Sequence, residues 1–266
     1  MIGRAMSEDD YQRLPGCRAS YVKALWNATP AHFVARSINA DSDALRIGRA
    51  FHCRLLRPDD FAAEFVVSPK FDRRTKAGKA DAEAFAADAG GRGIVDADEM
   101  ESIDAMATAV WESTTARGLL RLADSFETVV SADIDGVPCK AKLDAVGDFA
   151  LVDVKTTVSA APRAFARSCA EYLYHVQFAF YRAILRANGY DPGCMAIIAV
   201  EKARPHCVAS YVLNPADIDA VEADALELAR LWRDCSVAGR WPGYADEVVE
   251  LAMPAWALRR STTLDA

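Results

Sequence analysis

The sequence predicts a single α+β domain in which helices pack against a largely antiparallel sheet. Helical segments come first, a three-stranded meander follows over residues 126–155, and a helix, a hairpin and a last helix complete the order. A chain of 266 residues can bury a core of that size in one domain. Because no repeat or linker divides residues 1–266, we expect one domain with its core at 18–235 and a C-terminal tail over 236–266 packed on that core.

The N-terminal part of the chain is expected to be helical. Residues 18–38 predict a helix that breaks at Pro30, because the residue before a proline disfavours helical geometry. A second helix is expected within the segment 41–61, where Pro58 ends it. Gly48 inside that helix costs about 1 kcal/mol relative to alanine. We therefore expect the backbone of another element to approach closely at this glycine.

Further helices are expected on either side of the sheet. Residues 97–117 carry apolar side chains at helical spacing, and Trp111 is among those expected to face inward. Residues 160–187 are expected to form a helix in two pieces. A hairpin over 194–213 and a final helix over 216–235 then follow.

The sheet itself is expected to begin as an antiparallel meander. Residues 126–134 alternate between apolar and polar, and Asp135-Gly136 after them is among the strongest short hairpin signals. The chain is expected to return over 137–146 and to reverse again before a third strand over 149–155.

Chemistry is expected in the stretch KAKLDAVGDFALVDVK, residues 140–155. Because side chains alternate along a strand, Asp153 and Lys155 project from the same face of the third strand. The reversal brings Asp144 near them, so two carboxylates and an ammonium are expected to converge. Glu127, at the start of the first strand, can lie at the edge of this acidic patch or face solvent. Such a group suits metal-assisted cleavage of a phosphodiester.

Composition excludes several classes of function. The formal net charge of −7 argues against a simple DNA-coating protein, because non-specific affinity for nucleic acid comes mainly from lysine and arginine. It is compatible with a nuclease, because an acidic exterior can coexist with a local basic groove. No phosphate-binding glycine motif follows a strand, so neither nucleotide hydrolysis nor a dinucleotide cofactor is expected.

The cysteines and the apolar segments indicate which metal motifs and which cellular compartment to expect. Seven cysteines are scattered without a Cys-x-x-Cys pair, which predicts neither a zinc ribbon nor a clustered iron–sulfur motif. No stretch approaches the roughly 20 apolar residues that span a bilayer, and the N-terminal segment lacks the apolar core of a signal peptide. A cytoplasmic protein is therefore expected.

The densest basic cluster leads from a loop into a helix and consists of Arg73, Arg74, Lys76 and Lys79. Two interpretations stay open from the residues alone: a solvated charged turn, or a contact to a phosphate backbone that positions DNA without reading its sequence. His52 lies four residues after Gly48 on the same helix face, where an isolated histidine is usually structural.

The ordered segments GRAFH, LD, DVK and QFAFY resemble the PD-(D/E)XK nuclease superfamily, and more closely the exodeoxyribonuclease VIII-like nucleases of phages and prophages. The resemblance covers roughly residues 18–215 and includes the segment FDRRTKAGKA. A DxK triplet alone is a weak signal, whereas the ordered set is specific. The resemblance implies a restriction-endonuclease-like core with a mixed central sheet. Longer members carry a large N-terminal region without a counterpart here, so the sequence resembles their catalytic domain.

The resemblance also implies roles for individual residues. A Mg²⁺ or Mn²⁺ ion would be held by the carboxylates of Asp144 and Asp153, the backbone carbonyl of Val154 and the imidazole of His52. Lys155 would orient the attacking water or stabilise developing charge. Gln177 and Tyr181 would position the lysine, the water or the phosphate. An iron–sulfur cluster is not expected, because the four flanking cysteines of relatives that hold one are missing.

At the level of function, the resemblance implies processive 5′→3′ digestion of one strand of linear duplex DNA. It further implies a ring-like homo-oligomer that feeds recombination with a phage single-strand annealing protein. The cluster of Arg73, Arg74, Lys76 and Lys79 would line the DNA channel. Two alternatives stay open: an endonuclease of the same superfamily, which shares the chemistry, and a non-catalytic module that binds DNA or protein.

Overall fold

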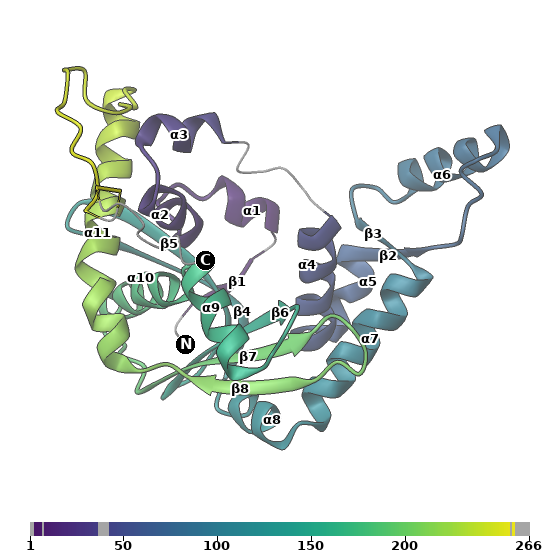
Figure 1. Cartoon of the computed structure of the whole chain (residues 1–266). Helices are drawn as coiled ribbons and strands as arrows, with labels where there is room; N and C mark the ends of the chain where they lie inside the picture. Colours follow the sequence, from purple (N-terminus) through teal and green to yellow (C-terminus); the bar gives the residue numbers. More distant parts are fainter. Residues whose placement is uncertain (1–2, 7, 37–42, 256, 259–266) are drawn as a thin grey trace, which may run out of the picture.

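The computed structural model describes residues 3–6, 8–36, 43–255 and 257–258. Its centre is a six-stranded sheet in the order β1-β4-β5-β6-β7-β8 (Figure 1). β6 and β7 run parallel and the other neighbours antiparallel, so the predicted mixed sheet built on a meander is confirmed. These strands are β1 (Arg4–Ala5), β4 (Ser125–Ile134), β5 (Val137–Val146), β6 (Ala150–Thr157), β7 (Cys194–Glu201) and β8 (Val208–Val212).

The helices follow the predicted order with sharper boundaries. The predicted break at Pro30 separates α2 from α3, and the Thr29 side chain caps α3 by accepting the backbone N–H of His32. The parts of the two predicted N-terminal helices that fall on 37–42 lie outside the described residues. The helices are α1 (Glu8–Arg13), α2 (Ala19–Trp26), α3 (Pro30–Ala35), α4 (Asp43–Leu56), α5 (Phe61–Glu64), α6 (Lys76–Asp88), α7 (Ala97–Glu112), α8 (Thr114–Leu120), α9 (Pro162–Glu171), α10 (Tyr174–Ala187) and α11 (Pro215–Ala238), with a 3₁₀ turn at Pro58–Asp60.

A feature that the sequence did not predict is a second, two-stranded sheet. β2 (Phe65–Ser68) and β3 (Gly93–Asp96) pair in parallel, and α6 connects them. Figure 1 shows this unit extending from the side of the molecule, with α6 at its outer end. The basic cluster at the start of α6 is therefore carried away from the central sheet.

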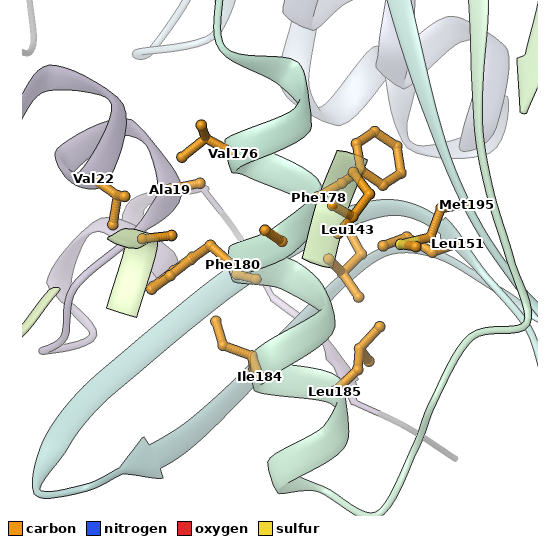
Figure 2. Packing of buried hydrophobic residues seen from close by; sticks show 14 of the residues in the cluster. Ala19, Val22, Leu143, Leu151, Val176, Phe178, Phe180, Ile184, Leu185 and Met195 are labelled. Atoms are coloured by element: carbon orange, nitrogen blue, oxygen red, sulfur yellow. The ribbon is translucent and has the colours of Figure 1, made fainter. Parts of the chain in front are cut away.

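Apolar side chains cover both faces of the central sheet. On one face, α10 packs Phe178 against strand residues such as Leu143 and Leu151, while Phe180 points to the other side of the helix, towards Val22 of α2 (Figure 2). On the other face, α4, α7 and α8 pack against apolar side chains of β6 and β7, among them Val152, Val154 and Ile198. The result is a three-layer arrangement, helices–sheet–helices.

The sheet opens between β5 and β6. These strands pair only at Ala145–Val152 and Val146–Leu151, next to the turn that joins them. Beyond that point β6 stays paired with β7 along its whole length, up to Thr157–Glu201. The two strands that carry the predicted acidic residues therefore diverge like a fork.

Two packing predictions were wrong. Among the described residues, no heavy atom outside the backbone of α4 lies within 4 Å of the position that a Cβ at Gly48 would occupy. No described backbone of another element therefore approaches it, and this face of α4 borders the open cleft described below. Trp111 is 41% exposed, because the buried stripe of α7 passes through Ile103, Met106 and Val110 instead. In the described part of the chain, no helix has the length and apolar character needed to cross a membrane.

Candidate active site

Three side chains from three elements converge at the open end of the fork. His52 projects from α4, Glu127 from β4 and Asp144 from β5. The Nδ1 atom of His52 lies 3.4 Å from Asp144 Oδ1 and 3.6 Å from Glu127 Oε1. One ligand atom from each residue lies within 4.8 Å of the others, which is the spacing of groups that share one metal ion. We call these residues the His–Glu–Asp group.

Glu127 reaches this group through an unusual backbone conformation. Its φ is 48°, in the left-handed region that a residue with a side chain rarely adopts. The β4–β5 ladder pairs Phe126 with Ala145 and Thr128 with Leu143 but omits the intervening Glu127 and Asp144. Such a conformation costs about 1–3 kcal/mol and persists where the surrounding structure enforces it, often at functional sites. The sheet is thus interrupted where its two carboxylates face each other.

Cations hold the second oxygen of Glu127. Lys142 Nζ lies 2.6 Å from Glu127 Oε2, and the nearest guanidinium nitrogen of Arg57 lies 4.0 Å away. Burial favours the neutral acid, but the hydrogen bond to His52 and the positive charges lower the pKa of Glu127 below its usual value. Glu127 is therefore held as a carboxylate directed at the imidazole.

Asp144 bridges the fork. Its Oδ2 accepts the backbone N–H of Val154 at 2.8 Å, across the gap where β5 and β6 no longer pair. Burial opposes its charge, yet His52 and Lys155 lower the pKa of Asp144 to about 2. Burial likewise opposes protonation of His52, but the two carboxylates raise its pKa to about 10. Glu127 and Asp144 therefore stay charged and stabilise a positive charge placed beside them.

Asp153 and Lys155 form the second half of the site, facing α10. Asp153 is only 2% exposed, and its Oδ1 accepts a hydrogen bond of 2.7 Å from the side-chain amide of Gln177. Its Oδ2 contacts the ammonium of Lys155 as an ion pair but makes no well-directed hydrogen bond to the described residues. Burial raises the pKa of Asp153 despite the attraction of Lys155. Both oxygens of Asp153 are thus held, one by the amide of Gln177 and the other by the ammonium of Lys155.

The predicted partners on α10 differ in their contacts. Gln177 binds Asp153 through its amide nitrogen, while its oxygen accepts a hydrogen bond of 3.3 Å from Lys23 of α2. Tyr181 lies one turn further on, borders the same cleft, and has its pKa raised well above the usual value by burial and then by the nearby carboxylates. The QFAFY segment therefore places one polar side chain directly on the site and a partly buried phenol beside it.

The donor set suits a hard divalent cation. Two carboxylates and an imidazole match the oxygen and nitrogen ligands of Mg²⁺ or Mn²⁺, with the imidazole favouring Mn²⁺. His52 and Asp144 were predicted as ligands and do lie together, whereas Glu127 was considered only as an edge residue. Asp153 pairs with Lys155 instead of joining the group, so its role as a ligand, and that of the Val154 carbonyl, stay predictions.

The site opens into a cleft of about 1030 Å³. Among the described residues that border it, lysines and arginines outnumber aspartates and glutamates by eight to four, although the whole chain carries a net charge of −7. Phosphate-bearing ligands are attracted to such local excess charge. The eight cationic residues are Arg18, Lys23, Arg49, Arg57, Arg92, Lys142, Lys155 and Lys202.

The predicted DNA-binding cluster is not among them. Arg73, Arg74, Lys76 and Lys79 lie at the start of α6, exposed and outside the cleft. Arg74 pairs with Asp72 at 3.0 Å. A role for this cluster in DNA binding therefore stays a prediction, and it concerns a surface separate from the site.

A family model described as a PDDEXK-like domain of unknown function (DUF3799) matches residues 13–251. The chain belongs to this family. The resemblance of its motifs to the PD-(D/E)XK superfamily is thereby confirmed, and the forked sheet with its flanking helices is the PDDEXK-like core of this member. No curated protein matches the chain.

A solved structure agrees on the fold of this PDDEXK-like protein. A protein from Eubacterium rectale, named "Putative exonuclease", matches with a TM-score of 0.59 and 13% identity, covering 97% of this chain and 100% of that one. At this identity the likeness concerns the fold alone. A phage related exonuclease from Haemophilus somnus 129PT covers 86% of this chain and 99% of that one, at 9% identity and a TM-score of 0.36.

Several residues of this PDDEXK-like site were missed by sequence reasoning. Lys142 carries a weak signal, since it lies two residues before Asp144 on the same strand and therefore on the same face. Lys23 and Arg57 carry none, because Lys23 lies on α2 and Arg57 directly follows α4, both far in sequence from the strands that carry the carboxylates. Arg92 lies in a glycine-rich loop that lacks the spacing of a phosphate-binding motif, so the sequence does not mark it as a site residue.

Proposed function

We propose that this protein is a divalent-metal-dependent exonuclease that hydrolyses phosphodiester bonds of linear double-stranded DNA. The observation that carries the proposal is the His–Glu–Asp group beside the Asp153–Lys155 pair, in a cleft with excess positive charge. The digestion runs 5′→3′ and leaves single strands for recombination with an annealing protein, as the resemblance to exodeoxyribonuclease VIII-like nucleases implies.

Each half of the site has its own task. His52, Glu127 and Asp144 would hold Mg²⁺ or Mn²⁺, which supplies neutralising charge and lowers the pKa of a bound water. Lys155 places its ammonium where the negative charge of the pentavalent phosphorus develops, and stabilises it. Gln177 holds Asp153, and Asp153 in turn orients Lys155. The cleft cations bind the flanking phosphates of the strand.

The test compares linear with closed circular duplex DNA. We expect degradation of end-labelled linear duplex with Mg²⁺ or Mn²⁺, an intact circle, and no reaction with EDTA. Release of label from the 5′ end first supports the polarity. Degradation of the circle contradicts an exonuclease and favours an endonuclease, and no cleavage of either substrate contradicts the enzymatic assignment.

A further inference from the structure

Two tyrosines at the junction of α9 and α10 border the cleft without a role in the proposed chemistry. Tyr172 follows the last residue of α9 and Tyr174 begins α10. Their rings stack with centroids 5.9 Å apart and an angle of 26° between planes. Tyr172 is 54% exposed, although an aromatic side chain of this size usually gains stability by burial. We call this pair the tyrosine platform.

The backbone between the two tyrosines makes this stacking possible. Residues two apart in a continuous helix point in nearly opposite directions, since each residue turns the helix by about 100°. Leu173 has a φ of 54°, in the left-handed region, while its side chain is buried. This conformation breaks the helix and brings both phenol rings to one side. The strained backbone at Leu173 thus places the exposed ring of Tyr172 on the partly buried ring of Tyr174.

The platform lies next to the reacting groups. The ring of Tyr174 lies 5.0 Å from Lys155 Nζ and 5.3 Å from Lys23 Nζ. Since Tyr172 stacks on Tyr174, its exposed ring lies within about three nucleotide steps of the Lys155 ammonium, at a rise of about 3.4 Å per nucleotide. Aromatic faces beside cations are the combination that single-stranded nucleic acid binds.

We propose that the tyrosine platform stacks an unpaired base of the strand whose phosphate is at Lys155. This inference rests on the proposed function and deepens it, because it makes the preferred substrate a strand end with unpaired nucleotides. A base inside a duplex has both faces covered by its neighbours and cannot lie on Tyr172. The cleft volume of about 1030 Å³ is at the upper limit of small-ligand sites, which suits a few nucleotides of one strand.

The experiment uses single-stranded oligonucleotides with the fluorescent base 2-aminopurine at successive positions from the end, in EDTA so that the strand is bound and not cut. We expect the wild type to quench the fluorescence at one or two positions through stacking. Tyr172→Phe keeps the quenching, whereas Tyr172→Ala loses it and binds about 5- to 150-fold more weakly, the range that about 1–3 kcal/mol per stacked base corresponds to. Tyr244→Ala, at an exposed tyrosine outside the cleft, is the matched control and leaves the quenching and the affinity unchanged.

The outcomes separate this inference from the proposed function. If wild type cleaves linear DNA in Mg²⁺ but Tyr172→Ala binds and quenches like wild type, the platform is refuted and the nuclease assignment stands. If the terminal base of a blunt duplex is quenched as strongly as the same base unpaired, the preference for an unpaired base is refuted. If wild type neither binds nor cuts DNA, the tyrosine platform and the nuclease assignment are both refuted.

Discussion

The cleft and the start of α6 both gather cations, but they differ in what those cations face. In the cleft, Lys142 and Lys155 point at carboxylates and their side chains are only 19% exposed. At the start of α6, the side chain of Arg74 is 91% exposed and its ion-pair partner Asp72 lies two residues away. Exposed charges are screened by salt, whereas buried ones act at nearly full strength. Density of charge along the sequence is therefore a poor guide to density of charge in space.

The largest effects are expected inside the cleft. Lys155→Ala and Asp153→Ala should keep the fold and lower the cleavage rate of linear duplex at least 10²- to 10³-fold, as loss of a group that stabilises transition-state charge does. Rates with saturating Mg²⁺ and a circular-dichroism melt of each variant check this. Wild-type activity in either variant would show that the cleft residues matter no more for cleavage than the exposed cluster at α6.

The metal site gives the next largest effect. Loss of a residue that only supports a metal ligand lowers metal affinity by about 10- to 100-fold. Because His52 is a proposed ligand itself, His52→Ala should weaken Mn²⁺ binding by more than that. Isothermal titration measures this affinity directly. His175→Ala is the control, because this histidine lies on α10 and packs against Trp26, outside the His–Glu–Asp group. Unchanged Mn²⁺ affinity in His52→Ala would make His52 a structural residue.

Lys23 tests the cleft through pH. Burial and then the neighbouring Lys155 lower the pKa of Lys23 to about 8. As pH rises from 7 to 9 this ammonium loses its proton, so affinity for a single strand should fall by about tenfold, the value of one charge-assisted hydrogen bond. Lys23→Arg stays charged and should not show the fall. Fluorescence anisotropy in EDTA measures the affinity of wild type and of Lys23→Arg over this pH range. Parallel pH profiles of the two proteins would contradict a role for Lys23.

The smallest effect is expected at α6. Replacing Arg73, Arg74, Lys76 and Lys79 by glutamine should leave the cleavage rate at saturating DNA and low salt within about twofold. If this cluster contacts the backbone of duplex DNA, the slope of log K against log salt should fall by about 0.9 for each lost contact. An unchanged slope would show that the cluster is a solvated charged turn. A loss of cleavage as large as that of Lys155→Ala would make the two regions equivalent.

Local signals in the sequence predicted the parts of the fold that local signals control. Asp135-Gly136 marked the hairpin, and both of these residues do have positive φ. The spacing of Asp144, Asp153 and Lys155 around a turn placed all three at the site. The divergence of β5 from β6 was not predictable, because the pairing of β6 with β7 depends on residues 44 positions later. That divergence decides that Asp144 faces α4 while Asp153 faces α10.

Other errors have the same origin. Gly48 was interpreted as a packing position, yet it borders a cleft formed by elements distant in sequence. The sequence does not decide where Glu127 points, because alternation along a strand cannot anticipate the left-handed φ that redirects its carboxylate. The pairing of β2 with β3 joins segments on either side of α6 and has no turn signal.

The backbone of Glu127 has an evolutionary consequence. Glycine or asparagine would adopt its φ of 48° at lower cost, but neither supplies the carboxylate that faces His52. Selection for stability and selection for the site therefore oppose each other at this one position. In descendants that no longer need the chemistry, position 127 should be among the first to drift towards glycine or asparagine. Its identity would then mark which copies of the fold still carry a working site.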